Sequence, residues 1–197
     1  MVRIDRERKT QGSLSNFGMN YISDVKAALI NDDEFVDVII NRYDPTGSNE
    51  LFVYFGKEGN NGSNQVLIYD QVKVDDGLFN GKIKIADLNN DGQPEIIQIG
   101  LTSNNSTSGK PKLKVYNYNI GSDDFELSDI SDQISSLTNS SFDLGDYDND
   151  QDIDVIISGF DSVDGLQTFI YNNVSESGSS NYKFENSNNI LGATRDG

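Results

Sequence analysis

Two short segments of this chain place oxygen-bearing side chains at alternate positions. Positions 1, 3, 5 and 9 hold Asp87, Asn89, Asp91 and Glu95 in one segment and Asp146, Asp148, Asp150 and Asp154 in the other. In a tightly curled loop such residues point toward one centre, and position 7, which is Gln93 or Asp152, can add a backbone carbonyl. With waters, these groups supply the roughly 6 to 8 oxygens at about 2.3–2.6 Å that calcium prefers. The spacing therefore predicts two calcium loops.

Two other interpretations compete with calcium binding. Asp and Asn also cap turns by accepting hydrogen bonds from nearby backbone amides. A turn needs only one such side chain, however, and the carboxylates crowded into residues 146–154 repel one another unless a cation neutralises them. An EF-hand is disfavoured because the twelfth residue from Asp87 is Gln98 instead of a bidentate Glu, and because the flanking residues favour strands.

A third segment aligns with these two loops without gaps but is incomplete. It has Asn31, Asp33 and Asp37 at positions 3, 5 and 9, whereas Leu29 stands at position 1. The missing carboxylate removes one charge and one oxygen, so we expect this loop to bind calcium weakly or not at all. In the alternative interpretation, hydrogen bonds and the packing of Leu29 hold the loop together without metal.

The three segments belong to an internal repeat. Asp37 and Glu95 are 58 residues apart, and Glu95 and Asp154 are 59 apart. Each period holds four predicted strands, one before the loop, one after it and two more. The third strands are predicted at residues 51–55, 113–118 and 168–172, and the fourth strands at 65–69, 125–127 and 182–185. Four short strands at a fixed period are typical of β-propeller blades. We predict an all-β chain whose single repeat region, residues 1–197, holds three four-stranded antiparallel blades near 22–80, 81–139 and 140–190.

Three blades are fewer than the four to eight of a closed propeller. The chain is therefore expected to be part of a larger propeller, or to have its ring completed by other copies. Tyr54, Tyr116 and Tyr171 recur at one position of each repeat, which predicts that they pack between blades instead of contacting a ligand.

Composition narrows the possible partners and chemistry. Fifteen basic residues against 32 acidic ones give a formal net charge of −17, which disfavours nucleic acid and is compatible with bound divalent cations. The chain has no Cys and no His, so disulfides, Cys-based zinc sites and the commonest general base are excluded. No apolar stretch approaches the roughly 20 residues that span a bilayer, and residues 1–10 lack the apolar segment of a secretion signal.

Residues 87–95 and 146–154 resemble the loops of the FG-GAP/VCBS repeats found in integrin α-subunit propellers and in many bacterial surface and secreted proteins. The resemblance implies a calcium ion between the first two strands of each blade and ligand recognition by loops on one face. It predicts an extracellular or cell-surface module for binding or adhesion, with a protein or carbohydrate ligand. A purely structural, self-assembling unit is the alternative, and a polysaccharide lyase or glycosidase is disfavoured because the calcium loops already use the dense acidic clusters.

Overall fold

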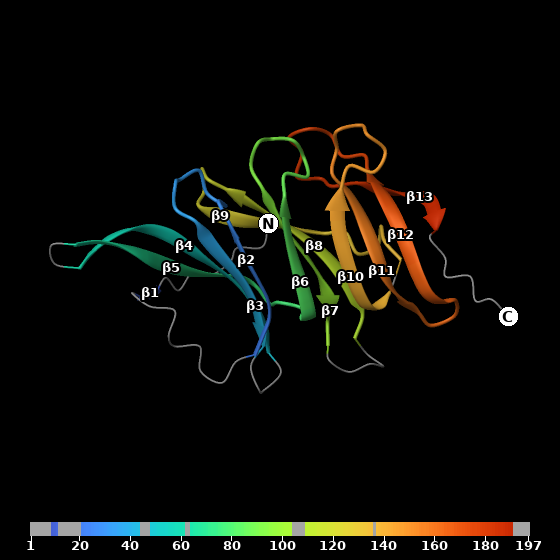
Figure 1. Ribbon diagram of the computed structural model, residues 1–197, viewed down its shortest axis with the longest axis horizontal. Helices are drawn as coiled ribbons and strands as arrows, with labels where there is room; N and C mark the ends of the chain where they lie inside the picture. Colours follow the sequence, from blue (N-terminus) through green and yellow to red (C-terminus); the bar gives the residue numbers. More distant parts are fainter. Residues whose placement is uncertain are drawn as a thin grey trace.

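The computed structural model describes residues 9–11, 21–43, 48–61, 64–103, 109–135 and 137–190. Within this part of the chain, strands are the only regular elements, and they form three antiparallel sheets that lie one after another (Figure 1). The strand orders are β1-β5-β4-β3-β2, β6-β7-β8-β9 and β10-β11-β12-β13. The prediction of an all-β chain with three four-stranded antiparallel repeats is thus confirmed, with β1 as an additional strand. None of the three described sheets closes on itself.

Within each repeat, strands that follow one another in the chain pair as a meander, and β1 is added beside β5 at the edge of the first sheet. The first sheet contains β1 (Lys9–Gln11), β2 (Tyr21–Ala28), β3 (Asp37–Tyr43), β4 (Asn49–Asn61) and β5 (Asn64–Asp75). The second contains β6 (Phe79–Ala86), β7 (Glu95–Leu101), β8 (Pro111–Asn119) and β9 (Asp124–Asp129). The third contains β10 (Thr138–Gly145), β11 (Asp154–Asp161), β12 (Gly165–Asn173) and β13 (Phe184–Ile190).

The second strand of each sheet follows a loop and begins with a β-branched run. These runs, Val38–Ile40, Ile96–Ile97 and Val155–Ile157 in β3, β7 and β11, favour strands because branched side chains fit the pleated surface. In β7, every residue except the last is buried, so a neighbour covers both faces of this strand. Strands of this kind must lie inside a stack of sheets.

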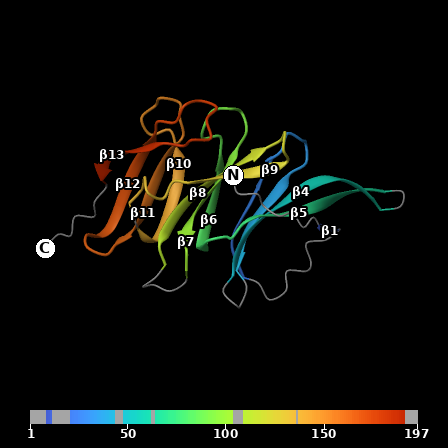
Figure 2. The same cartoon turned by 180° about the vertical axis from the view of Figure 1, so that it is seen from behind.

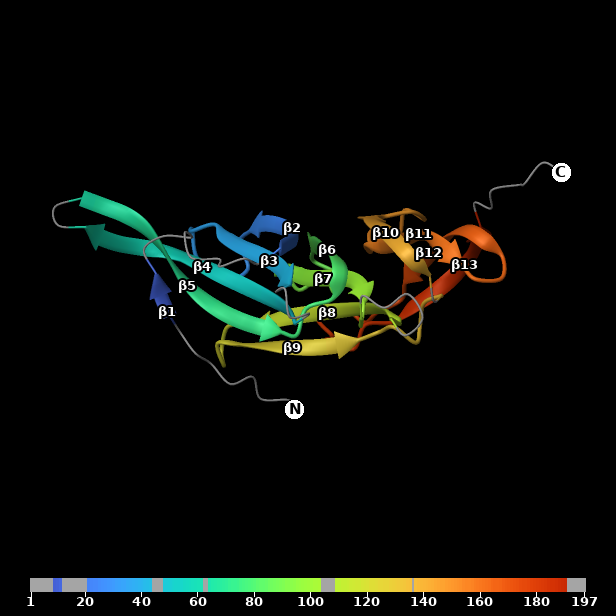
Figure 3. The ribbon, with the colours of Figure 1, turned by 90° about the horizontal axis from the view of Figure 1, so that it is seen from below.

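Apolar side chains fill the space between successive sheets. One buried cluster joins Ile39 and Val53 of the first sheet to Ile96 and Tyr116 of the second. The next cluster joins the second sheet to the third in the same way, with members that include Ile97, Val115, Val155 and Tyr171. The sheets follow one another, with the first strands β2, β6 and β10 along one side of the molecule (Figure 3).

Polar contacts also hold neighbouring sheets together. The Gln98 side chain donates a hydrogen bond to Asn41 Oδ1 at 2.8 Å, and both residues are fully buried. Near the first strands, the Ile83 N–H donates to Asp24 Oδ2 at 2.8 Å, and Lys84 Nζ pairs with Asp143 Oδ1 at 2.8 Å. Buried polar groups are costly unless they are hydrogen-bonded, so the Asn41–Gln98 contact helps to fix the relative position of the first two sheets.

The repeated tyrosines occupy equivalent places, since Tyr54, Tyr116 and Tyr171 each pair with the residue that follows the last acidic loop position. Tyr116 and Tyr171 pack between sheets as predicted. Tyr54 differs: it clusters with Ile40 and Phe52 on the opposite face of the first sheet, away from the second.

The fourth strand of the first repeat, predicted at residues 65–69, lies within β5 but is longer than predicted. Residues 65–69 pair with 56–60 in an extension of the β4–β5 hairpin, whereas Phe55 pairs with Asp70 and Leu51 with Asp75. The part of β5 that pairs beside Leu51–Phe55 is therefore its second half, Asp70–Asp75. The predicted strand at 182–185 begins in the structure at Phe184.

Candidate metal centre

Three loops with the same place in their sheets carry the predicted ligands. Residues 29–36 connect β2 to β3, residues 87–94 connect β6 to β7, and residues 146–153 connect β10 to β11. All three loops lie at the same end of the sheets, together with the connection between β12 and β13 (Figures 1 and 2). We call them the first, second and third loops.

The first acidic residue of the second and third loops organises the loop backbone. Its carboxylate accepts the N–H groups of positions 5 and 6, at 3.1 and 2.9 Å for Asp87 and at 3.1 Å for both bonds of Asp146. The chain curls so tightly that positions 4 and 6 take positive φ values, 55° at Asn90, 89° at Gly92, 63° at Asn149 and 79° at Gln151. Asn and Gly tolerate this conformation, whereas Gln151 is strained there.

The acid at position 9 has a role that sequence reasoning missed. Asp37, Glu95 and Asp154 are at most 1% exposed, and each accepts the backbone N–H of loop position 2 at 2.7–2.8 Å. A second oxygen of Asp37 accepts the N–H of Gly56 at 2.9 Å, and that of Asp154 accepts the N–H of Asn173 at 2.8 Å. This acid therefore ties the loop to the third strand of its own repeat.

The third loop brings three carboxylates together. Asp146, Asp148 and Asp154 each place one oxygen within 4.8 Å of the other two, and no other such group of three or more acidic side chains occurs in the described residues. Asp146 and Asp148 are exposed, whereas Asp154 is buried. Oxygens on opposite sides of a calcium ion are about 4.6–5.2 Å apart. The donor set and its spacing therefore fit a hard divalent cation.

The carboxylates in this group repel one another. Desolvation, followed by the nearby carboxylates of Asp150 and Asp154, raises the pKa of Asp148. Like charges at this separation disfavour ionisation, and a bound cation would reverse that effect. The amide of Asn172 donates to Asp148 Oδ2 at 2.7 Å and partly offsets the crowding.

Two predicted ligands of the third loop lie outside the group. Asp150 Oδ1 accepts the Asp152 N–H at 2.9 Å, and Asp152 Oδ1 accepts the side-chain amide of Asn90 at 2.6 Å. The second contact crosses to the neighbouring sheet and links the second and third loops. The backbone carbonyl predicted as a ligand at Asp152 stays a prediction.

The second loop has Asn89 where the third has Asp148, so it gathers fewer charges. Asn89 is 2% exposed, and its side chain both donates to Asp91 Oδ2 and accepts the Asp91 N–H at 3.1 Å. Asp91 Oδ1 accepts the N–H of Gln93 at 2.8 Å. Burial raises the pKa of Glu95 to about 7. The charges of Asp91 and Asp87 contribute to the rise, whereas the hydrogen bond from the Leu88 N–H opposes it. The residues of the second loop stay predicted ligands.

The first loop lacks the organising carboxylate. Leu29, at position 1, is 46% exposed, so the expectation that its packing supports the loop is wrong. Hydrogen bonds hold the loop instead: Asp33 accepts the Asn31 amide at 2.7 Å and the Phe35 N–H at 2.8 Å. Asn31 Oδ1 is buried without a hydrogen-bond partner. Burial also raises the pKa of Asp37.

The second and third loops are joined across the interface between their sheets. The Asn173 amide donates to the Leu88 carbonyl at 2.7 Å, while the Asn173 N–H binds Asp154. The Gly178 N–H donates to the Asn89 carbonyl at 2.7 Å. The end of β12 and the connection that follows it therefore hold the second loop against the third sheet.

Comparisons with protein-family models, with curated proteins and with solved structures find no match to this chain. Among the described residues, no helix is long and apolar enough to cross a membrane.

Proposed function

We propose that this chain is a set of calcium-stabilised β-propeller blades that serves as a binding or adhesion module at the cell surface or outside the cell. The convergence of Asp146, Asp148 and Asp154 at the start of β11 carries the proposal. The second loop repeats the same backbone hydrogen bonds around Asp87, which supports a second calcium site. The first loop is proposed as a degenerate site because Leu29 replaces that carboxylate.

Calcium suits these loops better than magnesium. The loops offer carboxylate, amide and carbonyl oxygens from flexible side chains, and calcium accepts 6 to 8 such ligands in variable geometry, whereas magnesium requires a near-ideal octahedron. Sites of modest charge and partial exposure are filled where calcium is plentiful, as it is outside cells. The proposed ions are structural, since each lies between two strands and binding to the folded state stabilises it.

The proposed binding role is supported by the gathering of the loops at one end of the sheets (Figure 1). Loops on a rigid scaffold commonly carry recognition. The test is to probe arrays of glycans and extracellular-matrix proteins with the labelled chain, in calcium and in chelator. Calcium-dependent retention of a defined ligand class is expected, and Asp148→Asn should weaken it at limiting calcium. Equal retention in chelator, or none on either array, would contradict the proposal.

A self-assembling unit is a second candidate, and one surface feature favours it. Phe160 and Leu166 pair across β11 and β12 and are 46% and 67% exposed. They lie on the same face as the paired Ile156 and Ile170, the face that in the first two sheets is covered by the next sheet. A sheet from a second copy would continue the same packing.

Sedimentation velocity of the full chain across a wide concentration range tests this candidate. Self-assembly predicts larger species in the unmodified chain and their loss in Leu166→Asp, because a charge on this face opposes burial. A chain that stays monomeric at every concentration rules the candidate out. The binding module does not depend on this result.

A further inference from the structure

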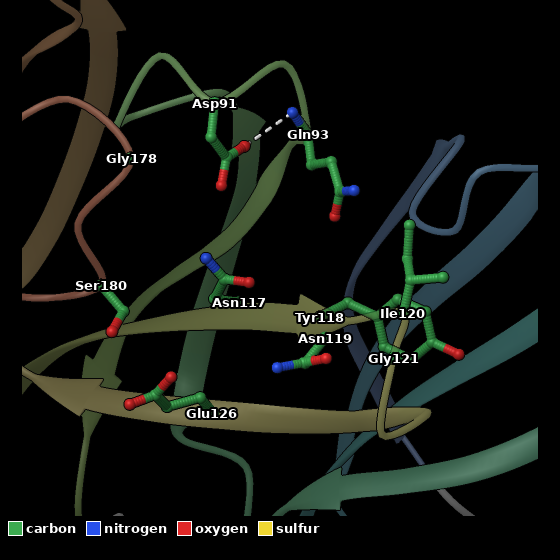
Figure 4. Close-up of a pocket in the computed structure, with 10 residues that line it drawn as sticks. All are labelled: Asp91, Gln93, Asn117, Tyr118, Asn119, Ile120, Gly121, Glu126, Gly178 and Ser180. Atoms are coloured by element: carbon green, nitrogen blue, oxygen red, sulfur yellow. Dashed lines mark hydrogen bonds between the residues drawn. The ribbon is translucent and has the colours of Figure 1, made fainter.

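A pocket of about 420 Å³ opens beside the second loop (Figure 4). Three segments form it: the second loop, the β8–β9 hairpin and the connection from β12 to β13, which belongs to the neighbouring sheet. Small-molecule sites commonly have volumes of about 300–1,000 Å³ and occur where separate structural units meet. The size and place of this pocket are therefore those of a ligand site.

The side chains around the pocket offer many hydrogen-bonding groups of both kinds. Amides come from Gln93, Asn117 and Asn119, and carboxylates come from Asp91 and Glu126. Figure 4 shows Asp91 and Gln93 on the loop above the strand segment that carries Asn117 and Asn119. The amides of Gln93 and Asn119 can donate and accept, whereas ionised carboxylates only accept. The Asn117 amide already donates to Glu95 and Tyr182, so it offers a ligand its oxygen alone. A ligand that matches this surface must itself donate and accept at several points.

The charge of the lining excludes some ligand classes. None of the ten lining residues is Lys or Arg, so phosphate and carboxylate ligands would meet two like charges and no counter-charge. A simple cation would use the two carboxylates but would offer no acceptor to the side-chain N–H groups of Gln93 and Asn119, which is costly once water is displaced. Hydroxyl groups satisfy carboxylates and amides alike.

The pocket also has a small apolar part. Ile120 lies in the lining with 43% of its surface exposed, and the buried Tyr118 lies next to it. A sugar ring has polar hydroxyls on its edges and C–H groups on its faces, so it can bond to the amides while its face covers Ile120. A ligand with polar groups alone would leave this side chain in water.

Hydrogen bonds hold the walls of the pocket in place. The Asn117 amide donates to Glu95 Oε1 and to Tyr182 Oη, both at 3.3 Å. The hairpin and the neighbouring sheet are joined by the Ser128 hydroxyl, which donates to the Ser180 carbonyl at 2.9 Å. Because the walls are already fixed, little ordering is required when a ligand binds.

We propose that this pocket binds a neutral, hydroxyl-rich ligand, namely a monosaccharide or one residue of a glycan. The proposal rests on the proposed binding function and names its ligand class and its place. Asp91 and Gln93 belong to the second loop as well, so calcium in that loop would fix one wall of the sugar site.

The test is an NMR titration of the ¹⁵N-labelled full chain, first with calcium and then with glucose, galactose, mannose and N-acetylglucosamine in turn. At least one sugar is expected to give saturable shifts in the side-chain amides of Asn117 and Asn119. Glu126→Gln should weaken that sugar at least tenfold, because it removes a charged acceptor from an exposed strand position without changing its size. Glu185→Gln, an exposed strand residue outside the pocket, is the matched control and should bind as the unmodified chain does.

The same spectra separate the two proposals. Amide shifts of the second loop report calcium binding. If the chain binds calcium and no sugar, only the sugar site is overturned. If it binds neither, both the calcium site and the sugar site are overturned. The sugar site would also be overturned by shifts confined to residues outside the pocket or by equal binding in Glu126→Gln. Spermidine is the cationic probe, and saturable shifts caused by it alone would overturn the sugar site as well.

Discussion

The buried carboxyl of Glu95 predicts that the calcium-free protein becomes less stable as the pH rises. Its pKa is about 7 in the folded chain, against an ordinary value of 4.5, chiefly because burial disfavours the charged form. An acid with a raised folded-state pKa contributes its full stability below pH 4.5. The contribution is lost as the pH rises through about 7.

The magnitude follows from the two pKa values. Each unit of difference corresponds to about 1.36 kcal/mol, so the free energy of unfolding should fall by about 2.5 kcal/mol between pH 5 and pH 8 on account of Glu95 alone. Glu95→Gln keeps an oxygen for the Leu88 N–H but cannot ionise. The variant should lose about 2.5 kcal/mol less than the unmodified chain over the same range.

Urea denaturation in the presence of a chelator, at several values between pH 5 and pH 8, measures the difference. Glu185→Gln removes an exposed strand carboxyl and should follow the unmodified chain. Calcium added at pH 8 should recover stability in the unmodified chain because it favours the ionised carboxylates. Parallel pH curves for Glu95→Gln and the unmodified chain would refute the account of the buried acid.

Three further substitutions test the loops. Asp148→Asn removes one of the three gathered carboxylates and should weaken calcium binding in the third loop at least tenfold. It should not lower the melting temperature of the chelator-treated chain. A lower melting temperature would show that the carboxylate is a structural cap. Leu29→Asp supplies the missing first acid and should add one weaker calcium site in a calorimetric titration, and an unchanged stoichiometry would count against the alignment of the first loop. Gln151→Gly relieves a positive φ that Gly92 takes in the second loop, so urea denaturation should show a gain of about 0.5–1 kcal/mol, and a loss would contradict the strain.

Much of the fold could be predicted because the pattern repeats. The β-branched run after each loop places the second strand, and a recurring Tyr places the third. The β4–β5 hairpin could not be predicted, since residues 56–64 are rich in Gly and Asn and therefore favour a turn over a strand. Pairing with the partner strand overrides that local preference, which is why β5 extends beyond the predicted residues 65–69.

The candidate site was predictable in its spacing and not in its internal contacts. Alternate acidic positions correctly bring Asp146, Asp148 and Asp154 together. The Asp150 carboxylate accepts a hydrogen bond from the backbone of its own loop. This orientation depends on the positive φ values of the loop, which the spacing of the acidic residues does not reveal. The double role of the position-9 acid shows only once the third strand lies beside it, although the acid's recurrence before every β-branched run is a usable signal.

A calorimetric calcium titration of the chelator-treated full chain tests the central claim most directly. Two sites per chain are predicted, one in the second loop and one in the third, with the Asp148→Asn variant losing the heat of one site. Three sites would show that the first loop binds despite Leu29. No heat of binding at millimolar calcium would contradict the account and leave the three loops as turns capped by their own carboxylates.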